Sequence, residues 1–174
     1  ENLRSQTQVR IDEDFIGTIN HSAKYRNGAT FAGKRVVVVG IGNSGAEIAL
    51  DLLEYGAEVW VSVRSPVNVV PRDPWRVPAQ VNAMCLSVFP TWVADGVGRF
   101  AQRLQYGKLK TYGLQESSIG AATNLVENGK VALIDVGTMS EIKNGRIKVL
   151  PGITRFESDE IQFDDGQIQP MDSV

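Results

Sequence analysis

Residues 35–45 of this 174-residue chain read RVVVVGIGNSG, a stretch that decides the fold. The four consecutive valines predict a strand that is buried on both faces, as strands of a parallel sheet are. After the glycine-rich turn, residues 46–55 carry apolar side chains at helical spacing, and Gly56 is typical of the position just past a helix. Residues 58–63 alternate with period two and predict a second strand. We therefore expect residues 35–63 to form one βαβ unit.

The turn has the GxGxxG spacing of a dinucleotide-binding site, in which each glycine has its own function. Gly40 makes the tight turn, Gly42 lets the backbone approach a pyrophosphate, and Gly45 lets the helix pack closely on the strand. The helix N-terminus offers free N–H groups to an anion. Ser44 is a candidate helix cap and phosphate donor, and Asn43 is a second candidate donor. The alternative is a structural glycine turn that binds no ligand.

The residues after the second strand bear on the choice between NAD and NADP. An NAD site usually has Asp or Glu there, on the ribose 2′-hydroxyl, whereas this strand ends in Val63, Arg64 and Ser65. A carboxylate would repel a 2′-phosphate, and an arginine can hold it with two hydrogen bonds. We therefore predict NADP(H), bound by Arg64 and Ser65, with Arg72 as a candidate second cation. The alternative is that both arginines are solvated surface residues.

Composition excludes several other kinds of protein. A formal charge of −2 gives no basic excess to hold a nucleic-acid backbone. With Cys85 as the single cysteine, the chain has neither a disulfide framework nor a cysteine-based metal site, and we expect no metal. No apolar run approaches the roughly 20 residues that span a bilayer, and the first residues do not resemble a signal peptide. These observations predict a cytoplasmic location without a transmembrane segment.

The rest of the chain predicts an α/β fold with additions. Residues 66–80 hold four of the seven prolines and should be largely loop, and residues 81–106 should be helical apart from an interruption at Pro90. We place a helical insertion at roughly residues 75–125. Further strands are expected at residues 131–134, 147–150, 160–163 and 167–169. The fold class is a Rossmann-like three-layer nucleotide-binding domain with a central parallel sheet, a helical insertion and a small antiparallel element near 147–169.

The aromatic residues of the insertion allow two interpretations. Trp75, Phe89, Trp92 and Phe100 are spaced as on a helix and are predicted to belong to the core. The alternative is that they line a substrate entrance or a membrane-facing patch.

A second motif lies before the first strand. Phe15, Gly17, His21 and Tyr25 resemble the FxGxxxHxxx(Y/F) signature of the class B flavin-containing monooxygenases, and GIGNSG at 40–45 is similar to that family's NADPH motif, GxGxSG. The similarity to YUCCA-type enzymes and their bacterial relatives continues to Val174. It includes VRSP at 63–66, VVPR at 69–72, KTYGL at 110–114, DVGT at 135–138 and KVLPGI at 148–153.

The resemblance implies a division of the chain and a wider protein around it. Residues 1–34 would be an arm that carries the signature, and residues 35–174 would be the NADPH-binding domain. The family's first glycine motif, which binds FAD, is absent, so FAD would bind mainly to a missing domain of the same polypeptide. That parent would use NADPH to reduce FAD, activate O2 and oxygenate a small nitrogen, sulfur or 2-oxo acid substrate. The fragment alone is expected to be inactive.

Two other functions stay open. One is an NADP-binding sensing or interaction module without catalysis. The other is a fragment of another pyridine-nucleotide flavoprotein reductase, although the lack of a CxxC motif argues against a disulfide reductase. Because the signature lies at the junction between domains in the resembled family, the resemblance implies a structural or cofactor-positioning role for His21. We assign no catalytic residue to the chain.

Overall fold

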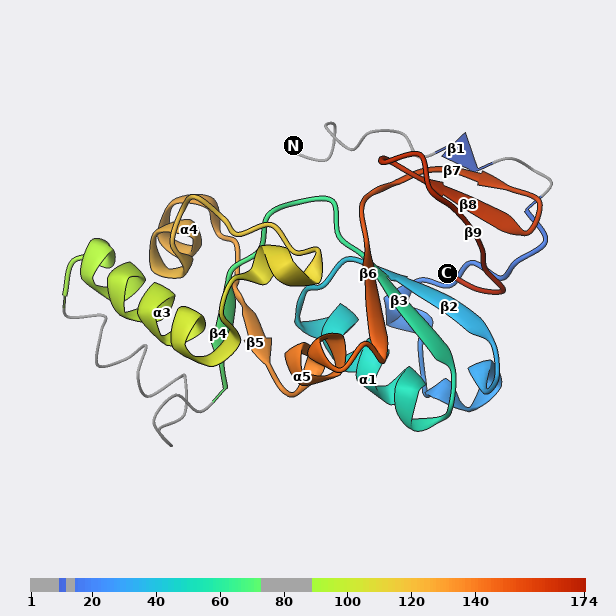
Figure 1. The fold of residues 1–174 in the computed structure, drawn as a ribbon, viewed down its shortest axis with the longest axis horizontal. Coiled ribbons are helices and arrows are strands. Elements are labelled where there is room, and N and C mark those ends of the chain that lie inside the picture. The colour runs from blue at the N-terminus through green and yellow to red at the C-terminus, as the bar shows by residue number, and fades with distance from the viewer. Residues whose placement is uncertain (1–9, 12–14, 73–88) are drawn as a thin grey trace.

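A parallel sheet of three strands forms the middle layer of the structure (Figure 1). In the order β2-β3-β6, its members are β2 (Arg35–Val39), β3 (Glu58–Ser62) and β6 (Ile147–Leu150). The computed structural model describes residues 10–11, 15–72 and 89–174. The valine run is β2, and residues 36–38 are all buried, so both of its faces are covered as predicted.

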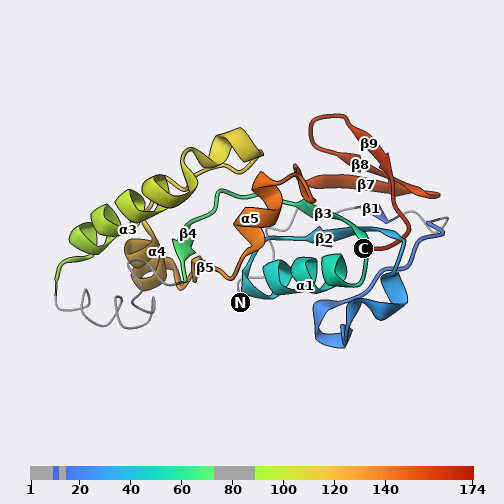
Figure 2. The ribbon, with the colours of Figure 1, turned by 60° about the horizontal axis from the view of Figure 1, so that its bottom comes forward.

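Two different layers cover the two faces of this sheet (Figure 2). Helix α1 (Asn43–Glu54) lies on one face and buries Ala46, Ala49 and Leu52 there. The opposite face, which includes Val37, packs against a second sheet. The predicted βαβ unit and the three-layer arrangement are therefore confirmed, with a sheet rather than further helices as the third layer.

The second sheet has the strand order β1-β7-β8-β9. Its strands are β1 (Arg10–Ile11), β7 (Ile153–Glu157), β8 (Glu160–Phe163) and β9 (Ile168–Pro170). Strands β7, β8 and β9 are antiparallel, whereas β1 runs parallel to β7. The expectation that this element begins near 147 is wrong, because β6 pairs with β3 in the parallel sheet. Ile147 and Leu150 pack into the cores on opposite sides of that sheet.

The last residues of the chain extend the parallel sheet beyond β2. Ser173 forms parallel bridges with Val36 and with Thr18, and its carbonyl accepts a hydrogen bond from the Val37 N–H at 3.0 Å. Asp172 anchors this segment, because its carboxylate accepts bonds from the Arg35 backbone N–H at 2.8 Å and from the Arg35 guanidinium at 2.8 Å. The chain before β2 and the chain after β9 thus meet at one edge of the sheet.

The insertion forms a lobe beside the parallel sheet (Figure 1). The chain enters the insertion after β4 (Val69–Pro71) and leaves it at β5 (Leu133–Asp135), and these two strands pair as a two-stranded parallel sheet. The remaining helices among the described residues are α3 (Thr91–Tyr106), α4 (Ala121–Asn128), α5 (Thr138–Lys143) and the 3₁₀ helices η1 (Ser22–Lys24), η2 (Gly28–Phe31) and η4 (Leu109–Tyr112).

The structure refines the sequence expectations for this part of the chain and corrects one of them. Residues 69–71 form strand β4 within a stretch predicted to be largely loop; Pro71 is tolerated there because it ends a strand at the edge of a sheet. Pro90 precedes α3 as its N-cap and does not interrupt the helix. Helix α5, which packs against α1 and β6 outside the lobe, is not among the sequence-based predictions. The predictions for residues 73–88 lie outside the described residues.

The aromatic side chains of the lobe are not in the core. Phe89, Trp92 and Phe100 are 54%, 73% and 63% exposed, so the prediction that they are buried is wrong. Trp75 lies outside the described part of the chain. Within the described ranges, no helix is both long and apolar enough to cross a membrane.

The Arg35–Asp172 pair leads to a prediction about acid stability. Hydrogen bonds from the Arg35 guanidinium and backbone hold the pKa of Asp172 at about 2, below its ordinary 3.8. Since the folded-state pKa is lowered, the ionised carboxylate stabilises the fold above about pH 4, and this contribution is lost as the pH falls toward about 2. Asp172→Asn should lower the Tm by about 2–4 °C near neutral pH, and the difference should shrink on acidification. Thermal unfolding across this pH range measures it.

Glu127→Gln is the matched control, because Glu127 is exposed on α4 and has no ion pair with another described residue. The control should leave the Tm unchanged at every pH. The Asp172 side chain is 38% exposed, so solvent screening keeps the expected effect small. An Asp172→Asn difference that stays constant from neutral pH to the acid limit would contradict the assignment.

Candidate functional site

The glycine turn between β2 and α1 has three glycines in three different environments. Gly40 has a φ of +93°, which L side chains rarely adopt, and its N–H donates to the Ser62 carbonyl at 2.8 Å. A Cβ on Gly45 would lie 2.3 Å from the carbonyl oxygen of Gly40, so only glycine fits between helix and strand. A Cβ on Gly42 would meet no atom within 4 Å. The space in front of Gly42 is therefore open to a ligand.

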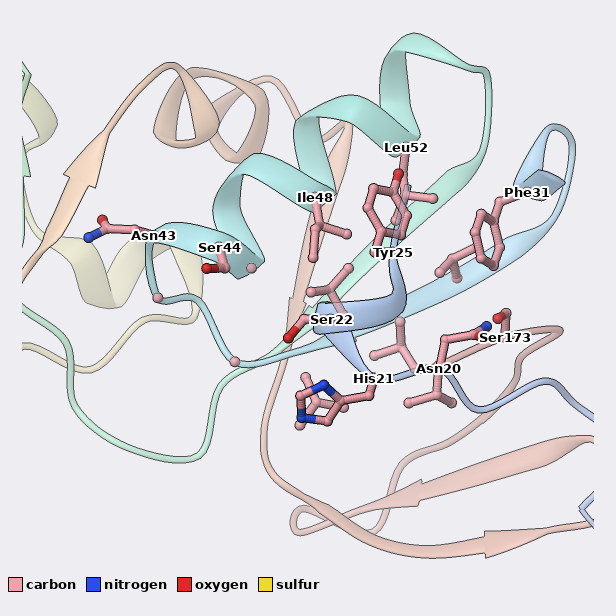
Figure 3. A pocket seen from close by; sticks show the side chains of 18 of the residues that line it. Asn20, His21, Ser22, Tyr25, Phe31, Asn43, Ser44, Ile48, Leu52 and Ser173 are labelled. Atoms are coloured by element: carbon pink, nitrogen blue, oxygen red, sulfur yellow. The ribbon is translucent and has the colours of Figure 1, made fainter. Parts of the chain in front are cut away.

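Helix α1 begins at this turn without a side-chain cap. Its N-cap is Gly42, and Ser44 lies inside the first turn, so the expectation that Ser44 caps the helix is wrong. Asn43 has a different partner: its Oδ1 accepts the Ile134 N–H of β5 at 2.8 Å. Figure 3 shows the Asn43 side chain directed away from the pocket that lies beside His21 and Ser44. The uncapped N–H groups and the helix dipole together make this end of α1 attractive to an anion.

Two hollows flank the turn and share Gly40 and Gly42. The first, which we call the Arg64 cleft, has a volume of about 640 Å³ and is also lined by Arg64 and Ser65. The second, which we call the His21 pocket, has a volume of about 660 Å³. The His21 pocket contains the remaining predicted residues of the turn and part of the signature segment, namely Asn43, Ser44, Gly45, His21, Ser22 and Tyr25 (Figure 3).

Arg64 enters its cleft from the end of β3 and lies across Gly152. A Cβ on Gly152 would overlap Oδ2 of Asp164 and lie within 3.2 Å of the Arg64 Cβ and Cγ, so glycine at this position makes room for both side chains. Arg64 forms no ion pair with another described residue and is exposed. Its guanidinium is therefore free to bind an anion that enters the cleft.

Lys130 is a site residue that the sequence reasoning missed. It lines the Arg64 cleft together with Arg64 and Ser65, so two cations border the same hollow. It follows Gly129, which ends α4 in the left-handed conformation with φ +63°, and it leads the chain back toward β5. In the sequence, only the Gly129-Lys130 dipeptide, which is typical of a helix end, marks this position. Nothing in the local pattern says that this loop faces the glycine turn.

Arg72 is not part of this site. It lines a separate hollow of about 440 Å³ together with Tyr106, Asp135 and Lys143, and that hollow shares no lining residue with the Arg64 cleft. The Tyr106 hydroxyl donates to Asp135 at 2.8 Å, and burial together with this bond raises the pKa of Tyr106 above its ordinary value. The structure thus places Lys130, and not Arg72, in the same hollow as Arg64.

Hydrogen bonds hold the segment that carries the signature, from Phe15 to Tyr25, and the residues after it against helix α1. The Tyr25 hydroxyl and the Gly28 N–H both donate to Oδ2 of Asp51, at 2.6 and 2.7 Å. Burial, followed by the bond to Asp51, raises the pKa of Tyr25, so the phenol stays protonated and remains a donor. His21 caps η1, with its Nδ1 accepting the Ala23 N–H at 3.1 Å. That bond leaves Nε2 of His21 for other partners in the pocket.

The site contains no metal centre within the part of the chain that the structure describes. Among those residues, no three His, Cys, Asp or Glu side chains are grouped so that they could hold a metal ion. Its chemistry is that of anion binding: an uncapped helix, an open glycine turn and two cations.

Comparison with known proteins relates the chain to one family. The family model described as "Flavin-binding monooxygenase-like" matches residues 7–174. The chain is 36% identical over 163 residues to the probable indole-3-pyruvate monooxygenase YUCCA3 of Arabidopsis thaliana, which covers 93% of the chain and 37% of that protein. It is 38% identical over 168 residues to the indole-3-pyruvate monooxygenase YUCCA8 of Oryza sativa subsp. indica, which covers 96% and 40%. The chain thus spans about two fifths of these relatives' length.

Solved structures show the same fold. A flavin-containing monooxygenase from Stenotrophomonas maltophilia matches 93% of the chain and 34% of its own length, with a TM-score of 0.55 and 22% identity. A cyclohexanone monooxygenase mutant from Rhodococcus sp. Phi1, bound to NADP+, matches 92% of the chain and 42% of its own length, with a TM-score of 0.63 and 17% identity. At these identities the likeness concerns the fold alone.

Gly42→Val tests whether the turn binds the dinucleotide. Because Gly42 has φ −72° and open space around its Cβ position, valine should leave the Tm nearly unchanged. The new side chain would fill the space in front of the turn, and NADPH affinity should fall by at least about tenfold in a calorimetric titration.

Gly45→Ala provides the contrast, because a Cβ there would lie 2.3 Å from the Gly40 carbonyl oxygen. That variant should lose about 1–3 kcal/mol of stability through overpacking. If Gly42→Val binds NADPH as well as the unchanged chain does, the dinucleotide lies elsewhere.

Proposed function

The chain belongs to the flavin-binding monooxygenase-like family, and we propose that it is the NADPH-binding part of a flavin-dependent monooxygenase. In this proposal residues 35–174 form the NADPH-binding domain, and residues 1–34 form the arm that carries the signature. The observation that carries it is the pair of cations, Arg64 and Lys130, in the cleft beside the glycine turn.

The cations distinguish NADPH from NADH. In a Rossmann fold the adenosine ribose lies at the end of the second strand of the βαβ unit, which here is β3, directly followed by Val63, Arg64 and Ser65. A 2′-phosphate there would meet the Arg64 guanidinium, the Ser65 hydroxyl and the Lys130 ammonium. Arginine offers a planar fork to phosphate, and lysine adds a point charge. NADH lacks this phosphate and would gain little from either cation.

The two hollows suggest how the rest of the dinucleotide lies. The pyrophosphate would occupy the space in front of Gly42, at the uncapped end of α1. With the adenosine half in the Arg64 cleft, the nicotinamide half would extend to the other side of β2, where Ser173 continues the sheet and the His21 pocket opens. The residues of the signature segment would then position the nicotinamide, through the fastening of Tyr25 to Asp51.

The residues present therefore fit NADPH. When bound, NADPH supplies a hydride to the flavin, and the reduced flavin activates O2 for transfer of one oxygen atom to a substrate. This chain would bind and orient the hydride donor, and we assign FAD mainly to the remainder of the parent polypeptide. Among nitrogen, sulfur and 2-oxo acid substrates, the relatives' names favour a 2-oxo acid, because indole-3-pyruvate belongs to that class.

Arg64→Ala and Lys130→Met test the specificity. Each variant should weaken NADPH binding by about 10- to 100-fold, because each removes a charge-assisted contact to the 2′-phosphate. NADH affinity should change by less than about threefold. Calorimetric titrations with the two nucleotides side by side measure both effects.

The matched control is Arg72→Ala, which removes a surface cation from the separate hollow. It should leave the affinities for both nucleotides unchanged. Equal losses of NADPH and NADH affinity in Arg64→Ala would refute the role of Arg64 in recognising the 2′-phosphate.

A separate experiment tests the assignment of NADPH to this chain and of FAD to the rest of the parent polypeptide. The 174-residue chain, purified without added cofactor, should show no flavin absorbance, and added FAD should bind far more weakly than NADPH. Visible absorption spectra and titration with free FAD measure this. A stoichiometric yellow chromophore in the purified chain would show that FAD binds here.

A further inference from the structure

Strand β5 has one edge that no other strand covers. On the edge that pairs with β4, the Leu133 N–H donates to the Asn68 carbonyl at 2.9 Å. Successive N–H groups of a strand point to opposite sides, so the Ile134 N–H lies on the other edge. Among the described residues, no strand pairs with β5 along that edge. An N–H group that is shielded from water is costly without an acceptor, so the Ile134 N–H needs one from elsewhere.

Asn43, the first residue of α1, supplies that acceptor. Its Oδ1 accepts the Ile134 N–H at 2.8 Å, although the two residues are 91 positions apart in the sequence. Because Ile134 presents a donor, the amide oxygen of Asn43 and not its nitrogen faces β5. The side chain is directed away from the His21 pocket (Figure 3). Asn43 therefore connects the glycine turn with the strand on which the insertion returns.

The two cations of the Arg64 cleft belong to different parts of the structure. Arg64 follows β3 of the central sheet. Lys130 is attached to the lobe, because its N–H donates to the Asn124 carbonyl of α4 at 3.2 Å. The separation between the two cations therefore depends on how the returning chain is held against the central layers. The bond from Asn43 to Ile134 holds that chain to α1.

The stretch between Lys130 and Ile134 is weakly packed. Val131 is 67% exposed, and the next buried side chain is that of Leu133 at the start of β5. A stretch with few packing contacts of its own takes its position from the residues at its two ends. One end is the bond of Lys130 to α4, and the other is the bond of Ile134 to Asn43.

We propose that Asn43 is a positioning residue that sets the preference for NADPH over NADH by holding Lys130 in the Arg64 cleft. The inference rests on the proposed function, in which Lys130 and Arg64 bind the 2′-phosphate. Asn43 itself would touch no part of the dinucleotide. The attraction between a cation and a phosphate falls with their separation, so it is strong only when the cation is held at hydrogen-bonding distance. Loss of the Asn43 acceptor would thus weaken a contact that NADPH makes and NADH does not.

The sequence makes Asn43 a candidate donor to the pyrophosphate instead, and the two roles have different consequences. Both nucleotides carry the pyrophosphate, so a donor to it would raise the affinities for NADPH and NADH by the same factor. A residue that acts through Lys130 raises only the affinity for NADPH. The ratio of the two dissociation constants separates the roles, because effects on the shared part of the nucleotides cancel in it.

Calorimetric titrations of Asn43→Leu, Asn43→Asp and Lys130→Met with NADPH and NADH test the proposal. Leucine has the branched shape of asparagine but no acceptor, and Asn43→Leu should lower the preference for NADPH at least about fivefold. Aspartate keeps the acceptor, so Asn43→Asp should keep the preference within about twofold, even if its charge weakens the binding of both nucleotides. Adding Asn43→Leu to Lys130→Met should change the preference by less than about twofold, because the lysine through which Asn43 acts is gone.

Thr138→Val is the matched control. The Thr138 hydroxyl donates to the Ala46 carbonyl at 3.3 Å, so it also joins α1 to the returning chain, but it lies after β5 whereas Lys130 lies before it. Valine has the shape of threonine without the donor, and this variant should keep the preference for NADPH. Amide hydrogen exchange at Ile134 gives a readout that needs no nucleotide. Exchange should be faster in Asn43→Leu and stay slow in Asn43→Asp and Thr138→Val.

Three outcomes would overturn the inference. Equal losses of NADPH and NADH affinity in Asn43→Leu would make Asn43 a donor to the pyrophosphate. Additive effects of Asn43→Leu and Lys130→Met on the preference would show that Asn43 acts without Lys130. Faster exchange at Ile134 with an unchanged preference would show that the bond to β5 does not position the lysine. Each of these rejects the role of Asn43 alone, whereas an unchanged chain that binds neither nucleotide rejects the proposed function and this inference with it.

Discussion

The contact between Gly45 and the carbonyl oxygen of Gly40 brings helix α1 against strand β2 more closely than any side chain would allow. A Cβ on Gly45 would be 2.3 Å from that oxygen. This close approach places the start of α1 at the edge of the sheet, with its N–H groups facing the space in front of Gly42. The two hollows on either side of the turn depend on it, because both are lined by the turn itself.

Helix α1 then connects parts of the chain that are far apart in sequence. At its first turn, Asn43 holds β5 through the Ile134 N–H, which ties the exit of the insertion to the glycine turn. In its third turn, Asp51 holds Tyr25 and Gly28 of the segment before β2. One helix thus sets the position of Lys130, which lies four residues before Ile134, and of His21, four residues before Tyr25. The polar residues of α1 act as fasteners, while its alanines provide the packing.

Much of the central fold follows from local patterns. The valine run, the glycine spacing and the alternation after Gly56 predict β2, α1 and β3, because each depends on residues close together in the chain. The Arg64 and Ser65 positions follow from the same unit. The family resemblance also holds, since the chain belongs to the flavin-binding monooxygenase-like family.

What could not be predicted depends on distant partners. Periodicity shows that α3 has an apolar side. The side that faces inward is set by hydrogen bonds from Asp95, Gln102 and Tyr106, whose partners lie in α4, β4 and β5. The place of β6 in the parallel sheet likewise depends on β3, some 90 residues earlier. Lys130 reaches the cleft only because the insertion returns to the sheet, and Arg72, although nearer in sequence to Arg64, is carried away by β4.

The pairing of β4 with β5 has a consequence for how this architecture can vary. Val69 lies opposite Leu133, so the chain leaves the nucleotide-binding layer and returns to it at neighbouring points. The entropic cost of closing such a loop rises only slowly with its length. The intervening segment can therefore be lengthened, shortened or exchanged while the sheet and the glycine turn stay as they are. Proteins that share this nucleotide-binding scaffold can therefore differ in the segment between β4 and β5, and so in the outer surface that it forms.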